Sequence, residues 1–399
     1  MNVGILTYHF VSNFGANLQT LSTYKYIENA GHTPIIINWI PEDLENYYNE
    51  NVSQQQNIAH RLFAKNNYKN ITSICRTTHD IAHVIDENEI DIVVIGSDAV
   101  FTYIPPLARI HICRRGLVYS KPCIDSDFPN PFWGDFVKHT SRKIKVAIMS
   151  ASAQNTKYRM ILGGRLKRKF SESLALFNYI SVRDVWTQEM LSYLTKGKVF
   201  PQITPDPVFA FQYNVNPPET QYVKHNLNVD KPYVLVSLTG EYLNTVWLQE
   251  LEKVFAKLGI TLIGLPQTNK PFKSILRHNI NFPLDPLDWY NIIRESRGYI
   301  GELMHPVLVS LHNSVPVYVF DKYGFKNNRG FDEKSSKTYQ IMSRFGLCSN
   351  YYNKLTRKPF PSACDVANAI LSFDTPKCTQ FANYMLEQYK EMMTMILSL

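Results

Sequence analysis

The chain has 399 residues, of which 45% are hydrophobic and 13% aromatic, and its formal net charge is +8 with a pI near 9.0. This composition is globular and excludes a disordered chain, and the length favours two domains over one compact core. No segment approaches the roughly 20 apolar residues of a membrane-spanning helix.

The first residues carry no basic region before an apolar run, so we expect no signal peptide. The six cysteines have neither a CxxC pair nor the spacing of metal ligands, so we expect reduced thiols, a cytoplasmic protein and no metal site. The positive charge is spread along the chain, and its densest run, residues 165–169, contains no interleaved aromatic residue. It therefore argues against a nucleic-acid partner and fits a protein that acts on anionic substrates, with possible peripheral association at the inner face of a membrane.

The first half of the chain alternates strand-like and helical segments. An amphipathic helix is expected over residues 16–30, with Gly31 placed to end it. The strand-like segments are residues 2–8, 33–39, 91–95, 145–149 and 179–182. This alternation predicts a Rossmann-like domain over residues 1–211.

A Pro- and Asn-rich passage, residues 212–231, is interpreted as a linker. The alternation then resumes and predicts a second Rossmann-like domain over 232–365, with a helix over 247–258. Its expected strands are residues 233–238, 260–265, 299–302 and 315–320. A helical stripe in the segment 366–399 predicts a C-terminal helix that closes the structure. The fold class is therefore α/β, GT-B-like, with a cleft between the two sets of strand ends.

Polar residues follow most of these strands, at the edge where open α/β sheets bind ligands. They are Asn13, Asn17, Ser97, Asp98, Ser150, Arg183, Asp206 and His305. Of the eleven histidines, His305 alone combines a strand end, a helix start and a nearby carboxylate, that of Glu302. We therefore expect His305 to be functional.

Several common catalytic motifs do not occur in the sequence. The chain has no GxGxxG, GxxxxGK[ST], HExxH or GxSxG pattern, so the best sequence support for dinucleotide, P-loop, zinc-protease or serine-hydrolase chemistry is missing.

The order of the strand-end motifs resembles that of the polysaccharide pyruvyl transferase family. NFGANLQTLSTYKYIENAGH at 13–32 is similar to the family's opening element, IVVIGSDAVF at 92–101 to its Gly-Ser-Asp element, and SVRD at 181–184 to its Val-Arg-acidic element. Asp206-Pro207 and the region of His305 complete the order.

The resemblance implies transfer of the pyruvyl group of phosphoenolpyruvate (PEP) to two hydroxyls of a sugar in a capsule, exopolysaccharide or cell-wall glycan, or in its lipid-linked repeat unit. The product is a ketal, phosphate is released, and no cofactor is implied. It also implies His305 as the catalytic acid/base, which suits a group that titrates near neutrality. Glu302 could orient the ring or raise its pKa.

The donor carries a carboxylate and a phosphate, so its site needs cations or strong hydrogen-bond donors. Arg183 is expected to act as a bidentate clamp, although a salt bridge to Asp184 or Asp206 is the alternative. The other expected donor contacts are Ser97, Ser150, Ser336 and Lys337, the last two from a basic cluster that also includes Lys322, Arg329 and Lys334.

Asp98 is either a second catalytic base or a helix N-cap. Asn13, Asn17 and Asp206 are expected to contact the acceptor, with a turn-forming role as the alternative for Asp206.

Two other functions stay open from the sequence. One is a GT-B glycosyltransferase that uses a nucleotide-sugar, with Asp332 or Glu333 as its ribose contact. The other is a non-catalytic carbohydrate-binding homologue. The sequence does not indicate an oligomeric state.

Overall fold

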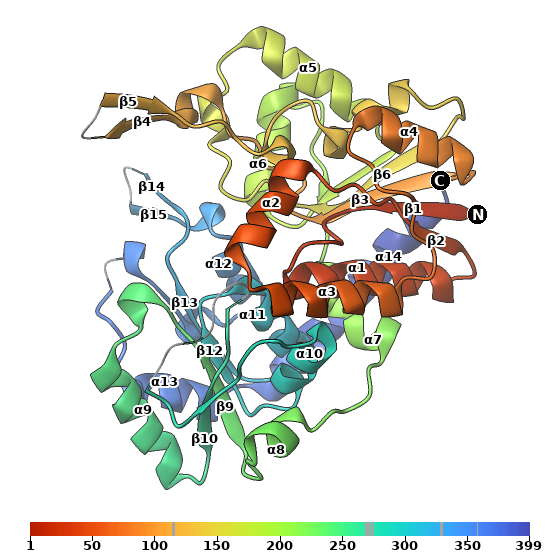
Figure 1. The fold of residues 1–399 in the computed structure, drawn as a ribbon. Coiled ribbons are helices and arrows are strands. Elements are labelled where there is room, and N and C mark those ends of the chain that lie inside the picture. The colour runs from red at the N-terminus through yellow and green to blue at the C-terminus, as the bar shows by residue number, and fades with distance from the viewer. Residues whose placement is uncertain (114–115, 268–271, 273–274, 328–329, 357) are drawn as a thin grey trace.

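The computed structural model describes residues 1–113, 116–267, 272, 275–327, 330–356 and 358–399. Two six-stranded sheets dominate this part of the chain, and helices surround both (Figure 1). All strand pairs within the two large sheets are parallel. The structure is therefore an α/β fold with two Rossmann-like halves.

The N-terminal sheet has the strand order β2-β1-β3-β6-β7-β8. Its strands are β1 (Asn2–Leu6), β2 (Thr33–Ile36), β3 (Ile92–Asp98), β6 (Lys145–Ala151), β7 (Tyr179–Val182) and β8 (Gln202–Ile203). From β1 the chain adds β2 on one side and then adds β3 and the later strands on the other side, so the topological switch point lies between β1 and β3. Such a switch point opens a crevice at the carboxyl ends of the strands.

The C-terminal sheet has the order β11-β10-β9-β12-β13-β16. Its strands are β9 (Tyr233–Ser237), β10 (Thr261–Gly264), β11 (His278–Asn279), β12 (Tyr299–Gly301), β13 (Val317–Asp321) and β16 (Tyr351–Asn353). Here the switch point lies between β9 and β12, directly before the helix that begins with Met304 and His305.

The α-helices follow the strands as crossovers or cover the ends of the structure. They are α1 (Phe14–Asn29), α2 (Glu42–Asn51), α3 (Gln54–Asn67), α4 (Thr78–Glu87), α5 (Gly164–Leu174), α6 (Val185–Thr195), α7 (Phe211–Val215), α8 (Tyr222–Leu227), α9 (Thr245–Lys257), α10 (Pro286–Arg294), α11 (Met304–His312), α12 (Lys337–Arg344), α13 (Ala363–Leu371) and α14 (Thr375–Leu397).

Strand β3 shows how a sheet is covered on both faces. Ile92 and Val94 belong to a core that α1 covers, whereas Val93 and Ile95 belong to a second core on the opposite face. Alternate residues of a strand point to opposite faces, so a run that is apolar throughout requires cover on both. This explains why β3 reads as a continuous hydrophobic segment.

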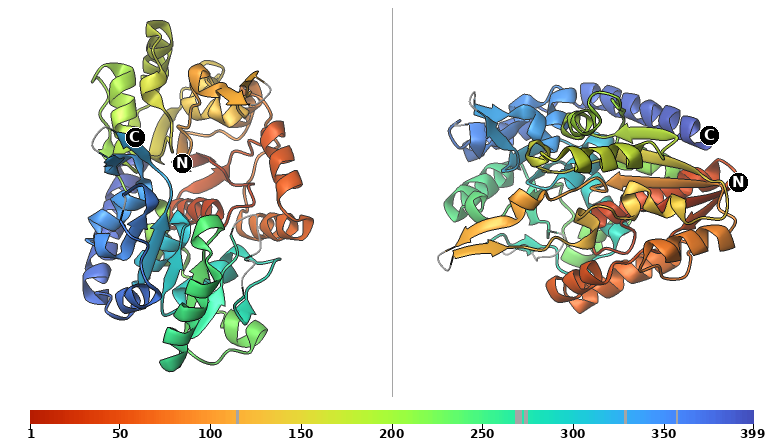
Figure 2. Two further views of the ribbon diagram at one scale, coloured as in Figure 1. Left: turned by 90° about the vertical axis from the view of Figure 1, so that its left-hand side faces the viewer. Right: turned by 90° about the horizontal axis from the view of Figure 1, so that it is seen from above.

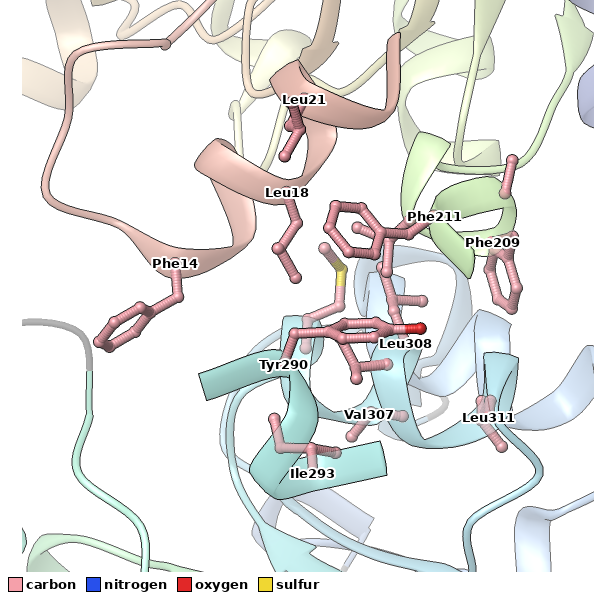
Figure 3. Packing of buried hydrophobic residues seen from close by; sticks show 14 of the residues in the cluster. Phe14, Leu18, Leu21, Phe209, Phe211, Tyr290, Ile293, Val307, Leu308 and Leu311 are labelled. Carbon is pink, nitrogen blue, oxygen red and sulfur yellow. The ribbon is translucent and has the colours of Figure 1, made fainter. Parts of the chain in front are cut away.

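One hydrophobic core continues from the N-terminal half into the C-terminal half. Figure 3 shows side chains of α1 packed toward those of α10 and α11, with the segment before α7 beside them. The labelled residues are Phe14, Leu18, Leu21, Phe209, Phe211, Tyr290, Ile293, Val307, Leu308 and Leu311. Because α1 and α11 share this core, their N-termini are held close together beneath the cleft.

The C-terminal helix crosses back to the N-terminal half. Met392 of α14 accepts hydrogen bonds from the hydroxyls of Ser150 and Ser181, at 3.3 and 3.4 Å. The two chain termini lie near each other in Figures 1 and 2. The expected closing helix is thus present, and it spans Thr375–Leu397 within the segment 366–399.

The passage 212–231, expected to be a linker, is partly helical. It holds most of α7 and all of α8, and the Asn214 side chain of α7 donates to the Ser22 carbonyl of α1 at 3.0 Å. Its prolines and asparagines break these helices into short pieces, which is why no long periodic pattern was visible in the sequence.

Two small antiparallel hairpins stand apart from the large sheets. They are β4 (Ile110–Cys113) with β5 (Gly116–Tyr119), and β14 (Phe325–Asn327) with β15 (Gly330–Asp332). The β4–β5 hairpin extends well beyond the body of the protein in both Figure 1 and the right-hand view of Figure 2.

Candidate active site

A cavity lies where the carboxyl ends of the two sheets face each other. Its walls come from the starts of α1, α11 and α12, the end of β3, and the segment after β6. Its lining residues are Asn13, Phe14, Gly15, Asp98, Gln154, Asn155, Pro266, Trp289, Glu302, Leu303, Met304, His305, Pro306, Tyr323, Lys337 and Thr338. The cavity therefore brings together five of the residues expected from the sequence, namely His305, Asp98, Glu302, Lys337 and Asn13.

Three helix N-termini converge on this cavity. The first residues of α1, α11 and α12 all line it. The side chains of Asn13 and Ser336 cap α1 and α12, whereas Leu303, which precedes α11, provides no side-chain cap. Backbone N–H groups and the helix dipoles make such termini favourable positions for anions. The cavity is thus suited to a negatively charged ligand.

His305 occupies the second position of α11, and its ring lies against α1. A Cβ atom on Gly15 would stand 2.0 Å from Cγ of His305, so only glycine fits there. The Nε2 atom of His305 is buried and has no hydrogen-bond partner among the described residues. An unpartnered buried ring nitrogen in a cavity wall is available to exchange a proton with a ligand.

The environment of His305 contains groups that shift its pKa in opposite directions. Burial lowers its pKa, and the positive charges of Arg183 and Lys337 act in the same direction. The carboxylates of Asp206 and Asp98 raise the pKa but do not outweigh burial. The ring is therefore neutral near pH 7 and able to accept a proton.

Lys337, the first residue of α12, supplies a cation to the same cavity. Burial lowers its pKa to about 8, with a further contribution from the charge of Arg183, while Asp98, Asp184 and Asp206 act in the opposite direction. The ammonium group is thus charged at neutral pH but loses its proton more readily than an ordinary lysine.

Arg183 lies between two carboxylates at the end of β7. Its Nη1 donates to Asp206 at 2.8 Å, and its Nη2 donates to Asp98 at 3.3 Å. Burial acts to raise the pKa of Asp98, but the charges of Arg183, His305 and Lys337 outweigh it and hold that pKa below the usual value. Asp98 lines the cavity, and Arg183 is hydrogen-bonded to Asp98 from behind it. Direct contact of Arg183 with the pyruvyl donor stays a prediction.

The backbone at two strand ends adopts conformations that are unfavourable for most residues. Asp98 has φ of 82° and Ser150 has φ of 46°. Such left-handed conformations are retained where the surrounding contacts fix them, and they are frequent at functional sites.

Glu302 is buried and fully engaged at the end of β12. Its carboxylate accepts hydrogen bonds from the amide and the hydroxyl of Thr239, and it forms an ion pair of 2.8 Å with Lys322. These contacts tie β12 to the segment after β9. We expected Glu302 to orient the His305 ring, but its carboxylate is directed to Thr239 and Lys322. The ring is held by packing against Gly15 instead.

Three serines expected at the donor are buried behind the walls of the cavity. Ser97 donates to the Ser150 carbonyl at 2.9 Å, and the Ser150 hydroxyl lies 2.6 Å from the Pro205 carbonyl. Ser336 caps α12 and donates to Asp321 at 2.5 Å. In this arrangement the serines position the strand ends and α12.

Two residues expected at the acceptor are also buried. Asn17 contacts the ring of His60 and the carbonyl of His9, and Asp206 is occupied by Arg183 and Gln19. Asn13 alone of this group lines the cavity. Arg329 of the expected basic cluster lies outside the described residues.

Sequence reasoning missed several lining residues. Gln154 and Asn155 follow the end of β6 after two intervening residues, so a polar pair shortly after a strand was the available signal. Trp289 comes from α10 and stacks on Phe14, with ring centroids 5.1 Å apart. Its place in the cavity wall depends on the packing of α1 on α10, which the sequence pattern does not reveal.

Within the described ranges, no cluster of three or more His, Cys, Asp or Glu side chains could hold a metal ion. Nor does any helix of the described chain have the length and apolar character required to cross a bilayer.

Comparison with solved structures agrees with a two-domain α/β fold of the GT-B type. A UDP-GlcNAc 2-epimerase from Neisseria meningitidis, bound to UDP-GlcNAc, matches with a TM-score of 0.53 and 9% identity over 100% of this chain and 99% of that one. A putative UDP-N-acetylglucosamine 2-epimerase from Listeria monocytogenes gives a TM-score of 0.48 and 11% identity over 96% and 90%. The glycosyltransferase SnogD from Streptomyces nogalater gives 0.44 and 10% over 99% of each chain.

Comparison of sequences identifies the family. The sequence model of the polysaccharide pyruvyl transferases matches residues 13–321, which reach into both halves and include most of the residues that line the cavity, whereas Tyr323, Lys337 and Thr338 lie beyond the match. The chain therefore belongs to the polysaccharide pyruvyl transferase family. A search of curated proteins found no match.

Proposed function

We propose that this protein transfers the pyruvyl group of PEP to two hydroxyls of one sugar in a capsule, exopolysaccharide or cell-wall glycan, or in its lipid-linked repeat unit. The proposal is carried by one observation: three helix N-termini and Lys337 surround a cavity into which His305 also faces. An anionic donor and a proton-exchanging group would meet there.

The charge of PEP suits these groups. Its carboxylate and phosphate lie close together, and each can accept hydrogen bonds from N–H groups at a helix N-terminus. The uncapped start of α11 and the ammonium of Lys337 are the donors that we assign to them. Arg183 would contribute through its charge, because its Nη1 and Nη2 atoms are held by Asp206 and Asp98.

In the proposed reaction, a sugar hydroxyl attacks the central carbon of PEP, and neutral His305 accepts its proton. The imidazolium gives that proton to the methylene carbon, which becomes a methyl group. The bond from the central carbon to the phosphate oxygen then breaks, and the second hydroxyl adds to the same carbon. Its proton leaves with the phosphate, so the two hydroxyl protons end on the methyl group and on phosphate.

Asp98 would assist as a charge beside His305. Its lowered pKa keeps it ionised at neutral pH, and a nearby carboxylate stabilises the imidazolium that forms during transfer. We assign it this role in preference to a second base, because it already accepts a hydrogen bond from Arg183.

The proposal includes no resident metal, since Lys337 and the helix N-termini can meet the donor's charge. It also includes a lipid-linked acceptor at the inner face of the membrane, which would need the protein to associate with that surface.

The test is ligand-dependent stabilisation followed by turnover. PEP at a concentration above its Kd should raise the melting temperature by mass action, and nucleotide-sugars should not. Phosphate release from PEP should depend on an acceptor glycan and survive treatment with a chelator. Stabilisation by a nucleotide-sugar but not by PEP would instead favour the glycosyltransferase alternative.

A matched pair of lysine variants sharpens this test. Lys337→Met should abolish the shift in melting temperature with PEP, whereas Lys169→Met, at an exposed position of α5, should retain it. An equal shift in both variants would contradict the assigned donor site.

A further inference from the structure

The β4–β5 hairpin carries an apolar face that the described protein leaves exposed. Ile110 pairs with Tyr119 and Ile112 pairs with Leu117, so these four side chains share one face of the two-stranded ribbon. Their exposed fractions rise from the first pair, at 47% and 58%, to the second pair, at 88% and 74%. An apolar face that stays in water does not stabilise a two-stranded hairpin, and a contiguous exposed face of this kind indicates an interaction surface.

The base of the hairpin is nevertheless firmly fixed. Arg109 is buried just before β4, where its Nε donates to the Ile104 carbonyl at 2.8 Å. Its Nη1 donates to the hydroxyl of Tyr119, and its Nη2 forms an ion pair of 2.8 Å with Asp127. Both strands of the hairpin are thereby attached to the segment that follows it.

The hairpin is rooted at the edge of the sheet that holds the cavity. It follows the end of β3, whose last residue, Asp98, lines the cavity. After the hairpin, Asp125 accepts a hydrogen bond of 2.8 Å from Tyr8, just beyond the end of β1. From this edge the hairpin extends away from the body (Figures 1 and 2).

The charge of the segment has a single sign. Residues 107–122 contain no Asp or Glu, and their charged residues are Arg109, Arg114, Arg115 and Lys121. Arg109 forms an ion pair with Asp127, and Lys121 is exposed. Arg114 and Arg115 lie outside the described residues and add two positive charges to the sequence of the segment. Apolar side chains accompanied by cations suit the boundary of a bilayer that contains anionic lipids.

We propose that the β4–β5 hairpin docks this protein on an anionic lipid bilayer, with Ile112 and Leu117 entering the headgroup boundary. The occupant is inferred from charge complementarity and from the higher exposure of the Ile112–Leu117 pair than of the Ile110–Tyr119 pair. The biological purpose rests on the proposed function, since a hairpin rooted beside the cavity would bring the cavity to a lipid-linked acceptor.

The experiment is co-sedimentation of the full chain with vesicles. One set contains phosphatidylcholine alone, and the other contains phosphatidylcholine with about one third phosphatidylglycerol, an anionic lipid. The protein should bind the anionic vesicles, and Ile112→Ser with Leu117→Ser should weaken that binding about tenfold or more. Phe200→Ser with Val246→Ser removes side chains of 67% and 63% exposure elsewhere and should leave binding unchanged.

Several outcomes would overturn the assignment. They are absent binding by the unmodified protein, equal binding to both kinds of vesicle, and equal binding by the hairpin variant. Self-association in the absence of lipid that the hairpin substitutions abolish would assign the face to a second copy of the chain.

Failure of the proposed function would be recognised separately. The hairpin variant should still release phosphate from PEP with a water-soluble acceptor, because neither substituted side chain lines the cavity. Vesicle binding without any pyruvyl transfer would leave the docking surface in place and refute the proposed reaction.

Discussion

The ring of His305 and the backbone of Gly15 are in direct contact across the two halves of the protein. A Cβ atom on Gly15 would lie 2.0 Å from Cγ and 2.2 Å from Nδ1 of His305. Gly15 belongs to α1 and His305 to α11, and a shared hydrophobic core holds these helices together. The position of the proposed catalytic ring is therefore set by a residue of the opposite domain.

Gly15→Ala should reduce turnover about 100-fold, because the new methyl group must displace the His305 ring from its reactive geometry. Alanine is itself favourable in a helix, so the expected defect arises from the clash. Gly164→Ala, at the start of α5, is the matched control, since its Cβ would meet nothing within 4 Å. Acceptor-dependent phosphate release measures both variants, and full activity of Gly15→Ala would refute the requirement for close contact.

His305→Asn should lower turnover about 100-fold or more, because the amide cannot accept and return a proton. The melting temperature should change little, since the Nε2 atom has no partner to lose among the described residues. His225→Asn, on the exposed face of α8, provides the control. Near-normal phosphate release by His305→Asn would remove this histidine from the mechanism.

The dependence of kcat/KM on pH should be bell-shaped. His305 must be neutral to accept a proton, and its pKa lies below the usual 6.5, so the rate should fall as pH decreases through that lower pKa. Lys337 must be charged to bind the donor, and its pKa is about 8, so the rate should fall as pH rises through about 8.

The alkaline limb can be assigned with one substitution. Lys337→Arg should move it to higher pH, because a guanidinium stays protonated there. An alkaline limb that is unchanged in this variant would show that another group controls it.

Arg183→Met should lower the free energy of unfolding by about 3–5 kcal/mol, because it takes the paired cation away from the buried carboxylate of Asp206 and from the partly buried carboxylate of Asp98. Adding Asp206→Asn should recover part of this loss by removing one buried charge. Denaturant unfolding measures both changes.

The matched control for Arg183 is an exposed ion pair. Lys224→Met breaks the contact of Lys224 with Asp230, whose side chains are 55% and 72% exposed, and should cost no more than about 1 kcal/mol. If Arg183→Met were equally mild, the buried pairings would not stabilise the site.

The sequence by itself determined the class of fold and the place of His305. Apolar strands alternating with amphipathic helices require parallel sheets covered on both faces, and their ends require polar residues at one edge. These are local patterns, so they can be read along the chain without knowing which segments meet.

Only the tertiary structure decided which polar groups lie together. Glu302 is three residues from His305 in the sequence, yet its carboxylate binds Thr239 and Lys322. The ring of His305 packs against Gly15 instead. The charges of Asp98, Asp206 and Lys337 shift the pKa of His305. Likewise, Trp289 lines the cavity although the sequence did not indicate it, whereas Ser97, Ser150 and Ser336 lie behind the cavity wall. The reason is physical: hydrogen bonds and charge interactions act over a few ångströms in space, and the packing of α1 on α10 and α11 sets those distances independently of separation along the chain.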